Sequence, residues 1–344
     1  MPFSEDTTFI LHAGAYKTAT STIQTLMMTN RDDILARHGV LYPRTATRRN
    51  TGSGNPDSQA HHLLYHVLNE AGAGADPSKI AEQQERLAEE IAAAGTNRVV
   101  LNTELFASAS IEQKRALVEF LAPARLRILY TLRRPDDYIE SMQNQAYKNF
   151  RSPSAAAGRV LPTLRNLQDW EAILGREALI VLAFTKNDYP GYLSRVFESL
   201  GVPGDDPIID PDLHDNPAMT LTGLLIRRTI ARRLKAQGIE ISRDLRHRLN
   251  VELDELEKKM PASPKAVFLT RKERRRAMAA NADDQVLLAG YMDDEERARF
   301  EAELDPEAPS KPRNVSKSLP MDAKTLEILC ASFSSGFLGK TLGF

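Results

Sequence analysis

The first residues that could do chemistry lie in a short segment near the N-terminus. The apolar run that begins at Phe9 predicts a strand ending at His12, and a helix is expected to begin soon after it. Backbone N–H groups at the start of such a helix have no partners within it, and together with the helix dipole they bind anions. Lys17 in the connection adds a positive charge. The small and hydroxyl-bearing residues around it are Gly14, Thr18, Ala19, Thr20, Ser21 and Thr22. The segment therefore predicts a phosphate-binding loop.

This segment differs from the standard phosphate loop of nucleoside triphosphatases. That loop has Gly directly before Lys, whereas Tyr16 precedes Lys17 here. A helix start rich in Ser and Thr, beside a surface lysine, is the alternative explanation. A second anion-binding element is needed to choose between the two.

A second element follows the apolar run Leu126–Leu132, which predicts another strand. Arg133 leaves the end of this strand, and Ser141 lies two turns into the helix that follows. A guanidinium fork and a hydroxyl can bind one phosphate together. Two anion sites at neighbouring strand ends fit a nucleotide that carries phosphate at two positions.

With these two motifs in order, the chain resembles the bacterial sulfotransferases that use 3′-phosphoadenosine 5′-phosphosulfate (PAPS). Other segments that resemble the family are Gly39-Val-Leu-Tyr-Pro43, Val99-Val-Leu-Asn-Thr-Glu104, Asp169-Trp-Glu-Ala-Ile-Leu-Gly175 and Val196-Phe-Glu-Ser-Leu-Gly-Val-Pro203. The resemblance spans most of residues 8–205. It implies a three-layer α/β/α fold with a mostly parallel central sheet, similar to phosphate-loop proteins. It also implies that the first loop binds the 5′-phosphosulfate, and that Arg133 and Ser141 bind the 3′-phosphate.

The resemblance implies in-line transfer of a sulfuryl group from PAPS to a hydroxyl or amine of a carbohydrate or small metabolite. Lys17 would stabilise the leaving nucleotide, since charge builds up there during transfer. Glu104, directly after the predicted strand Arg98–Asn102, is the first candidate for the catalytic base. A helix-capping or ion-pairing carboxylate is its alternative role. His12 is the second candidate base, and a buried structural histidine is the alternative there.

Two substitutions keep other functions open. Tyr16 and Ala19 stand where the family motif has Pro and Gly, so a nucleotide- or glycan-binding protein without turnover is one alternative. An ATP-dependent kinase is another, although Asn102-Thr103-Glu104 offers no clear aspartate for magnesium.

The order of apolar and amphipathic segments predicts an α/β protein with a parallel sheet. Strands are expected at 9–12, 98–102, 126–132 and 178–184. Helices are expected at 20–37, 76–94, 136–149, 192–200, 218–236, 243–260, 271–292 and 294–304. We expect a nucleotide-binding core at 1–205, a helical extension at 206–304 packed on it, and a Pro-containing linker and tail at 305–344.

Acceptor recognition is less readable from the sequence. The polar segment 44–59 predicts a mobile loop. Basic clusters that could bind an anionic glycan include Arg227-Arg228, Arg232-Arg233 and Arg271–Arg276, although solvated helix faces also explain them.

Composition limits the remaining classes. Lys and Arg number 45 and Asp and Glu 46, so no global charge recruits nucleic acid or an anionic membrane. The single cysteine and the isolated group His61, His62 and His66 predict no disulfide and no metal site. No apolar window approaches the ~20 residues of a membrane span, and the acidic N-terminus lacks the features of a signal peptide. We expect a cytoplasmic protein; the oligomeric state is not readable.

Overall fold

The computed structural model describes residues 2–14, 18–47, 59–70, 77–151, 158–213, 219–260 and 263–304. Lys17 and Tyr16 lie outside the described residues, as do the tail 305–344 and most of the loop predicted at 44–59.

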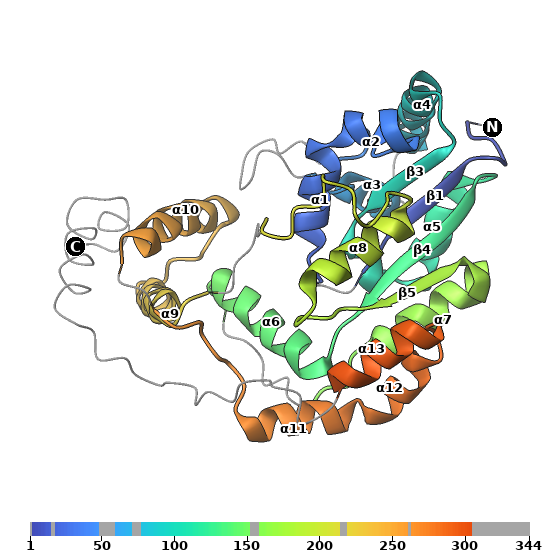
Figure 1. The fold of residues 1–344 in the computed structure, drawn as a ribbon. Helices are drawn as coiled ribbons and strands as arrows, with labels where there is room; N and C mark the ends of the chain where they lie inside the picture. Colours follow the sequence, from blue (N-terminus) through green and yellow to red (C-terminus); the bar gives the residue numbers. More distant parts are fainter. Residues whose placement is uncertain are drawn as a thin grey trace.

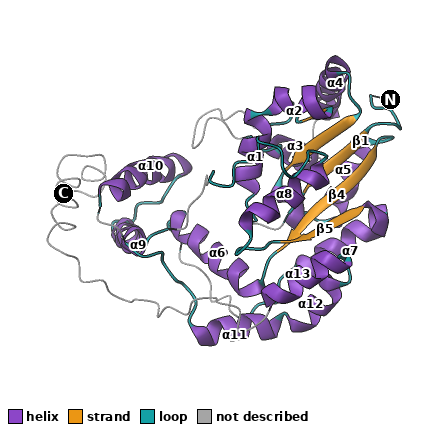
Figure 2. Ribbon diagram, in the orientation of Figure 1, coloured by secondary structure: helices purple, strands orange, loops and turns teal. Residues whose placement is uncertain are grey.

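A parallel sheet forms the centre of the molecule (Figures 1 and 2). Its order is β2-β3-β1-β4-β5, with β1 (Thr8–His12) in the middle. The other strands are β2 (Val40–Leu41), β3 (Arg98–Asn102), β4 (Arg125–Leu132) and β5 (Leu179–Ala183). The sequence predicted all of them except β2, which is too short to show a pattern.

Helices cover both faces of this sheet, which makes three layers. On one face lie α1 (Thr20–Thr29), α2 (Arg31–His38) and α8 (Tyr189–Leu200), which pack around Val100 and Leu129. On the other face lie α3 (His62–Glu70), α4 (Pro77–Ala94), α5 (Ile111–Leu121) and α7 (Thr163–Leu174). Alternate strand residues such as Leu101 and Ile128 face this second layer. Because both faces are buried, the centres of the strands are mostly apolar, and the α/β prediction is confirmed.

Two predicted helices are each divided in two by an asparagine. Asn30 separates α1 from α2, and its side-chain amide donates to the Leu26 carbonyl. Asn281 separates α11 (Arg271–Ala280) from α12 (Ala282–Ala289), and its amide donates to the Ala277 carbonyl. Such side chains compete with the helical backbone for hydrogen bonds, so the period of apolar residues continues while the helix ends.

The described elements after residue 205 are helices, as predicted. Helices α9 (Leu221–Ala236) and α10 (Arg243–Lys259) lie beside the end of α6 (Pro135–Lys148), away from the sheet (Figure 1). Helix α11 packs against α6, whereas α12 lies beside α7 and α13 (Asp294–Leu304) lies beside β5. There Glu296 of α13 accepts a hydrogen bond from the Ala183 amide at 2.7 Å. The domain boundaries themselves stay predictions.

A membrane-spanning segment is not found among the helices described, none of which combines sufficient length with sufficient apolar character.

Candidate functional site

The polar residues predicted to act together follow adjacent strands at the carboxyl edge of the sheet. His12, the last residue of β1, pairs with Asn102 of β3 on one side and with Leu129 of β4 on the other. The Thr103 amide donates to the His12 carbonyl at 3.1 Å, and Ala13 donates to Leu129 at 3.0 Å. The first loop therefore leaves the middle of the edge where open parallel sheets bind ligands.

The start of α1 lacks the groups that usually satisfy a helix N-terminus. Its N-cap residue, Ala19, offers no side-chain acceptor and has a left-handed backbone with φ of 59°. No acidic residue lies in the first turn, and the buried hydroxyl of Thr20 has no hydrogen-bond partner among the described residues. A Ser, Thr or Asp side chain caps α5, α8, α9, α10 and α11, whereas α2, α6, α7 and α12 resemble α1 in having no side-chain cap. The amides of this turn are thus available to an anion.

The residue before this turn is fixed from the neighbouring layer. The buried hydroxyl of Tyr192 on α8 donates to the Thr18 carbonyl at 2.9 Å and lies 3.2 Å from the Thr131 hydroxyl of β4. Burial raises the pKa of Tyr192 well above its usual range, so this donor keeps its proton. These bonds hold the carboxyl end of the loop against β4.

Glu104 lies beside the start of α1. It opens the short helix η2 (Glu104–Ser108), for which the Thr103 hydroxyl accepts from the Leu105 amide. Its carboxylate accepts from the Gln24 side chain of α1 at 3.4 Å and lies 3.7 Å from Nε2 of His62. The side chain of Glu104 is 25% exposed, so solvent reaches it beside α1. This placement is compatible with the predicted base.

His12 has a different environment. It is fully buried, and its Nδ1 accepts a hydrogen bond from the Asn102 amide at 3.0 Å. Burial lowers the pKa of His12 to about 4. An imidazole that is neutral, buried and already bonded at Nδ1 is a poor proton acceptor. The geometry therefore argues against His12 as the base.

The two arginines after β4 have separate roles. Arg134 bonds to Asp136 at 2.7 Å and to the Glu303 carbonyl at 2.8 Å, which ties the start of α6 to α13. Arg133 instead places its guanidinium 4.9 Å from the centre of the Phe184 ring. Burial lowers its pKa, while Asp137 and Asp136 act in the opposite direction. Arg133 is thus the arginine that remains a candidate for binding a ligand.

The register between β1 and β4 places Arg133 beyond the end of β1. Arg133 lies four residues beyond Leu129, the partner of His12. At the usual rise of a parallel strand this is about 13 Å along the sheet. Ser141 lies on α6, half-buried, further from the sheet. Arg133 and Ser141 therefore lie further along the sheet and α6 than His12 does.

Sequence reasoning missed several residues that organise this edge. Both ring nitrogens of His61 are hydrogen-bonded. Nδ1 accepts from the backbone amide of Asn102 at 3.0 Å, and Nε2 bonds to the Pro43 carbonyl at 2.9 Å. Gln24 binds Asn102 as well as Glu104. A polar residue on the apolar side of α1 is a signal for Gln24, but its partners come from elements about 80 residues away. No set of three potential metal-ligating side chains occurs in the part of the chain that the structure describes.

The basic clusters divide into paired and unpaired residues. Buried Arg227 pairs with Asp254 at 2.8 Å and with Glu257. Arg274 pairs with Asp136 at 3.1 Å, and also with Asp137 and Glu140. These two arginines connect helices and are not available to a ligand.

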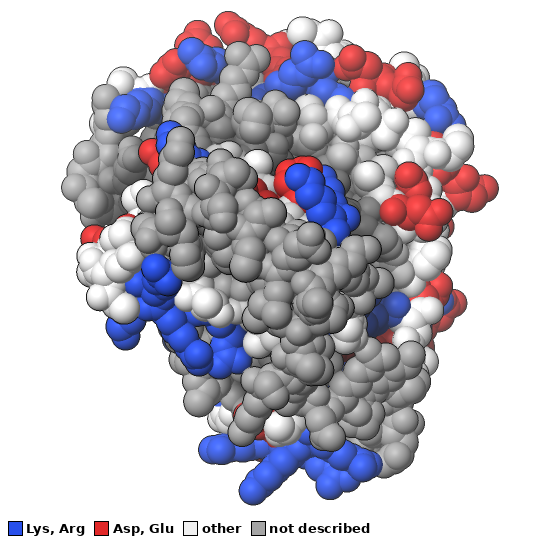
Figure 3. Space-filling view, turned by 90° about the vertical axis from the view of Figure 1, so that its left-hand side faces the viewer, with Lys and Arg blue, Asp and Glu red and all other residues white. Residues whose placement is uncertain are grey.

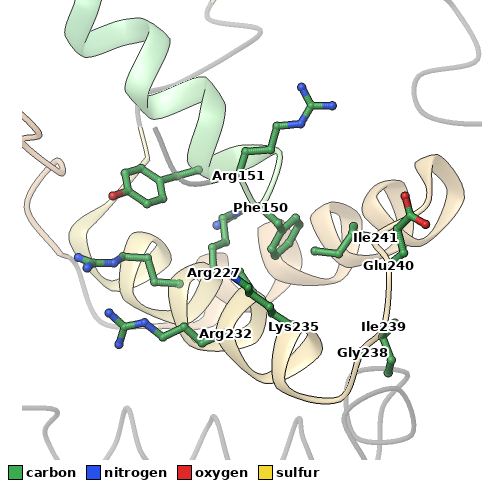
Figure 4. Close-up of a pocket in the computed structure, with 12 residues that line it drawn as sticks. Phe150, Arg151, Arg227, Arg232, Lys235, Gly238, Ile239, Glu240 and Ile241 are labelled. Atoms are coloured by element: carbon green, nitrogen blue, oxygen red, sulfur yellow. The ribbon is translucent and has the colours of Figure 1, made fainter. Parts of the chain in front are cut away.

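Basic residues outside these ion pairs line a cavity of about 500 Å³ between the end of α6, α9 and the connection to α10 (Figure 4). Its basic lining residues apart from Arg227 are Arg151, Arg228, Arg232 and Lys235. Glu240 is the acidic residue in the lining, and Ile239 and Ile241 supply apolar surface. Figure 3 shows basic side chains gathered on the face of the molecule that carries α9. The cavity is therefore a second anion-attracting region.

Comparisons with known proteins give little further information. No family model matches the sequence, and no curated protein matches it. A crystal structure of a sulfotransferase from Alicyclobacillus acidocaldarius is similar, with a TM-score of 0.36 and 16% identity over 67% of this chain and 96% of that one. A likeness of this size identifies neither a family nor a function.

Proposed function

We propose that the chain binds PAPS at the carboxyl edge of the sheet and transfers its sulfuryl group to a hydroxyl or amine. The observation that carries the proposal is the start of α1, which has no side-chain cap and where the buried Thr20 hydroxyl has no hydrogen-bond partner among the described residues. Such a turn suits the 5′-phosphosulfate. Arg133, four residues beyond the strand partner of His12, is proposed to bind the 3′-phosphate together with Ser141. The sequence resemblance to PAPS-dependent enzymes is independent support.

The proposed roles follow from the charges that change during transfer. The acceptor oxygen or nitrogen forms a bond to sulfur while the bond from sulfur to the 5′-phosphate oxygen breaks, and the acceptor proton passes to the Glu104 carboxylate. Lys17, together with the amides of the first turn of α1, stabilises the negative charge on the leaving nucleotide. Gly14, Thr18, Ala19, Ser21 and Thr22 form the remainder of the proposed loop. No step requires a metal ion.

We further propose that the cavity beside α9 binds the acidic groups of a carbohydrate or small-metabolite acceptor. Tyr147 lines the cavity and lies six residues after Ser141 on α6, which is about 9 Å along the helix axis. An acceptor anchored there by Arg232 or Lys235 would reach toward the sheet edge along α6.

Replacement of Arg133 tests the proposed nucleotide site. Arg133→Ala is expected to lower the affinity for adenosine 3′,5′-bisphosphate by roughly 10- to 100-fold, because a hydrogen bond to a charged group contributes about 1.5–3 kcal/mol. The affinity for adenosine 5′-phosphate, measured by the same calorimetric titration, should change less than about threefold. Equal losses for both nucleotides would contradict the assignment of Arg133 to the 3′-phosphate. Arg159→Ala, a change elsewhere on the surface, serves as the control.

A further inference from the structure

A buried chain of hydrogen bonds connects Glu104 to His12 through two amide side chains. Gln24 donates to Oε2 of Glu104 at 3.4 Å and to Oδ1 of Asn102 at 3.1 Å. The Asn102 amide lies 3.0 Å from Nδ1 of His12. The chain thus joins α1, β3 and β1, and of its members only Glu104 has a role in the sulfuryl transfer described above.

The chemistry of the groups fixes the direction of every bond in this chain. An ionised carboxylate only accepts hydrogen bonds, so the group of Gln24 that faces Glu104 is its NH₂. The same NH₂ requires an acceptor on Asn102, which leaves the NH₂ of Asn102 facing His12. Nδ1 of His12 therefore accepts, and the proton of the neutral ring lies on Nε2.

The protonated nitrogen is directed at the first loop. His12 is 0% exposed, and its Nε2 has no hydrogen-bond partner among the described residues. A Cβ placed on Gly14 would lie 2.9 Å from Nε2 and 3.1 Å from the Thr18 hydroxyl. Both polar groups therefore border Gly14, where the main chain enters the loop. A buried donor without an acceptor costs about 1–3 kcal/mol, which an anionic oxygen in the loop would recover.

We infer that His12 is a neutral hydrogen-bond donor to a phosphate or sulfate oxygen in the first loop, and that Gln24 and Asn102 are the positioning residues that keep its proton on Nε2. The claim that His12 donates to an anionic ligand rests on the proposed function. The claim that its proton lies on Nε2 rests on the hydrogen-bond geometry alone. Since Gln24 also donates to Glu104, its side-chain amide positions the candidate base as well as the Asn102 side chain that orients His12.

Nitrogen-15 NMR of labelled histidine side chains tests the tautomer directly. At pH 7, without any ligand, His12 should show a proton on Nε2 and none on Nδ1, and its signal is assigned by its absence from His12→Gln. Asn102→Leu, which removes the donor to Nδ1, should yield a mixture of tautomers. A proton on Nδ1 in the original protein, or an unchanged tautomer in Asn102→Leu, would overturn the positioning role.

Titration of the same sample tests the ligand. Adenosine 3′,5′-bisphosphate and, separately, inorganic sulfate should each move the Nε2 proton resonance. A resonance that moves with sulfate but not with the nucleotide would support His12 as a donor to an anion and refute the proposed nucleotide site. Nucleotide binding that leaves the resonance unmoved would refute the donor and keep the proposed function. No movement with either anion overturns the inference.

Two conservative variants separate donation from packing. His12→Gln retains an amide donor near the position of Nε2, whereas His12→Asn retains one only near Nδ1. Bisphosphate affinity should fall less than about threefold in His12→Gln and about tenfold or more in His12→Asn. Equal affinities would overturn the inference. If His12→Asn fails to fold, the NMR titration of the original protein still decides.

Discussion

Two regions of the molecule present groups that attract anions, and they hold these groups in different ways. At the sheet edge, His12, His61 and Asn102 are fully buried, and their hydrogen bonds have fixed directions. In the cavity beside α9, Arg232 and Lys235 are exposed and have no ion pair among the residues that the structure describes. Buried, oriented groups select a ligand by geometry, whereas exposed cations attract charge with little geometric demand. The sheet edge should therefore respond to single-atom changes and the cavity mainly to net charge and salt.

The largest expected effect is at Glu104. Glu104→Gln keeps the size of the side chain and a carbonyl acceptor for Gln24, but it removes the proposed base. Sulfuryl transfer to a hydroxyl acceptor should fall by roughly 10²- to 10⁴-fold, while bisphosphate affinity changes less than about threefold. The exposed Glu85→Gln on α4 is the matched control. A transfer rate near that of the control would contradict the assignment of the base to Glu104.

Acid should destabilise the sheet edge through its buried histidines. Burial lowers the pKa values of His12 and His61 to about 4, from 6.5. Between these values the unfolded chain binds more protons than the folded one, so the free energy of unfolding falls as the pH falls from 6.5 toward 4. Each histidine should lower the free energy of unfolding by roughly 2 kcal/mol between pH 7 and pH 5.

Urea unfolding at the two pH values measures this loss. His61→Gln should remove its own share of the pH dependence while leaving that of His12. A pH dependence that is identical with and without His61 would contradict this account of the buried ring.

The cavity should show a smaller, salt-sensitive effect. Arg232→Glu combined with Lys235→Glu is expected to weaken the binding of a sulfated disaccharide by about tenfold at low salt, because exposed charges contribute roughly 1 kcal/mol or less each. The difference should shrink at high salt, where screening is strong.

A charge-matched control for the cavity is Lys272→Glu with Arg275→Glu on α11, which carries the same change at exposed positions elsewhere. Equal loss in both double variants would show that net charge, and not the cavity, attracts the acceptor.

The smallest expected effect concerns the backbone at the start of α1. Ala19 has φ of 59°, a conformation that costs an L-residue roughly 1–2 kcal/mol relative to its usual backbone. Ala19→Gly should raise the free energy of unfolding by about 0.5–1 kcal/mol, measured with urea. Ala88→Gly in the interior of α4 should lower it by a similar amount. A loss of stability in both variants would contradict strain at Ala19.

The parts of the fold that depend on local pattern could be predicted from the sequence. Strands β1, β3, β4 and β5 are apolar runs of ordinary length, and most helices follow apolar periodicity. The breaks at Asn30 and Asn281 could not be predicted, because they result from bonds between an asparagine side chain and nearby carbonyl groups.

The candidate site was predictable only where its residues follow strands directly. His12, Glu104 and Arg133 lie at strand ends, so the parallel order brings them to one edge. Gln24 could not be found in this way, since its role depends on Asn102 and Glu104 folding next to it. The separation of Arg133 from Arg134 into two roles also required the tertiary contacts of α6 and α13.

The most direct test of the central claim is thermal stabilisation of the full chain by three nucleotides. Adenosine 3′,5′-bisphosphate at 100 times its dissociation constant should contribute about 2.7 kcal/mol to the stability. Adenosine 5′-phosphate and ATP with Mg²⁺, at the same concentration, should contribute much less. Selective stabilisation by ATP with Mg²⁺ would contradict a site for a 3′-phosphorylated nucleotide.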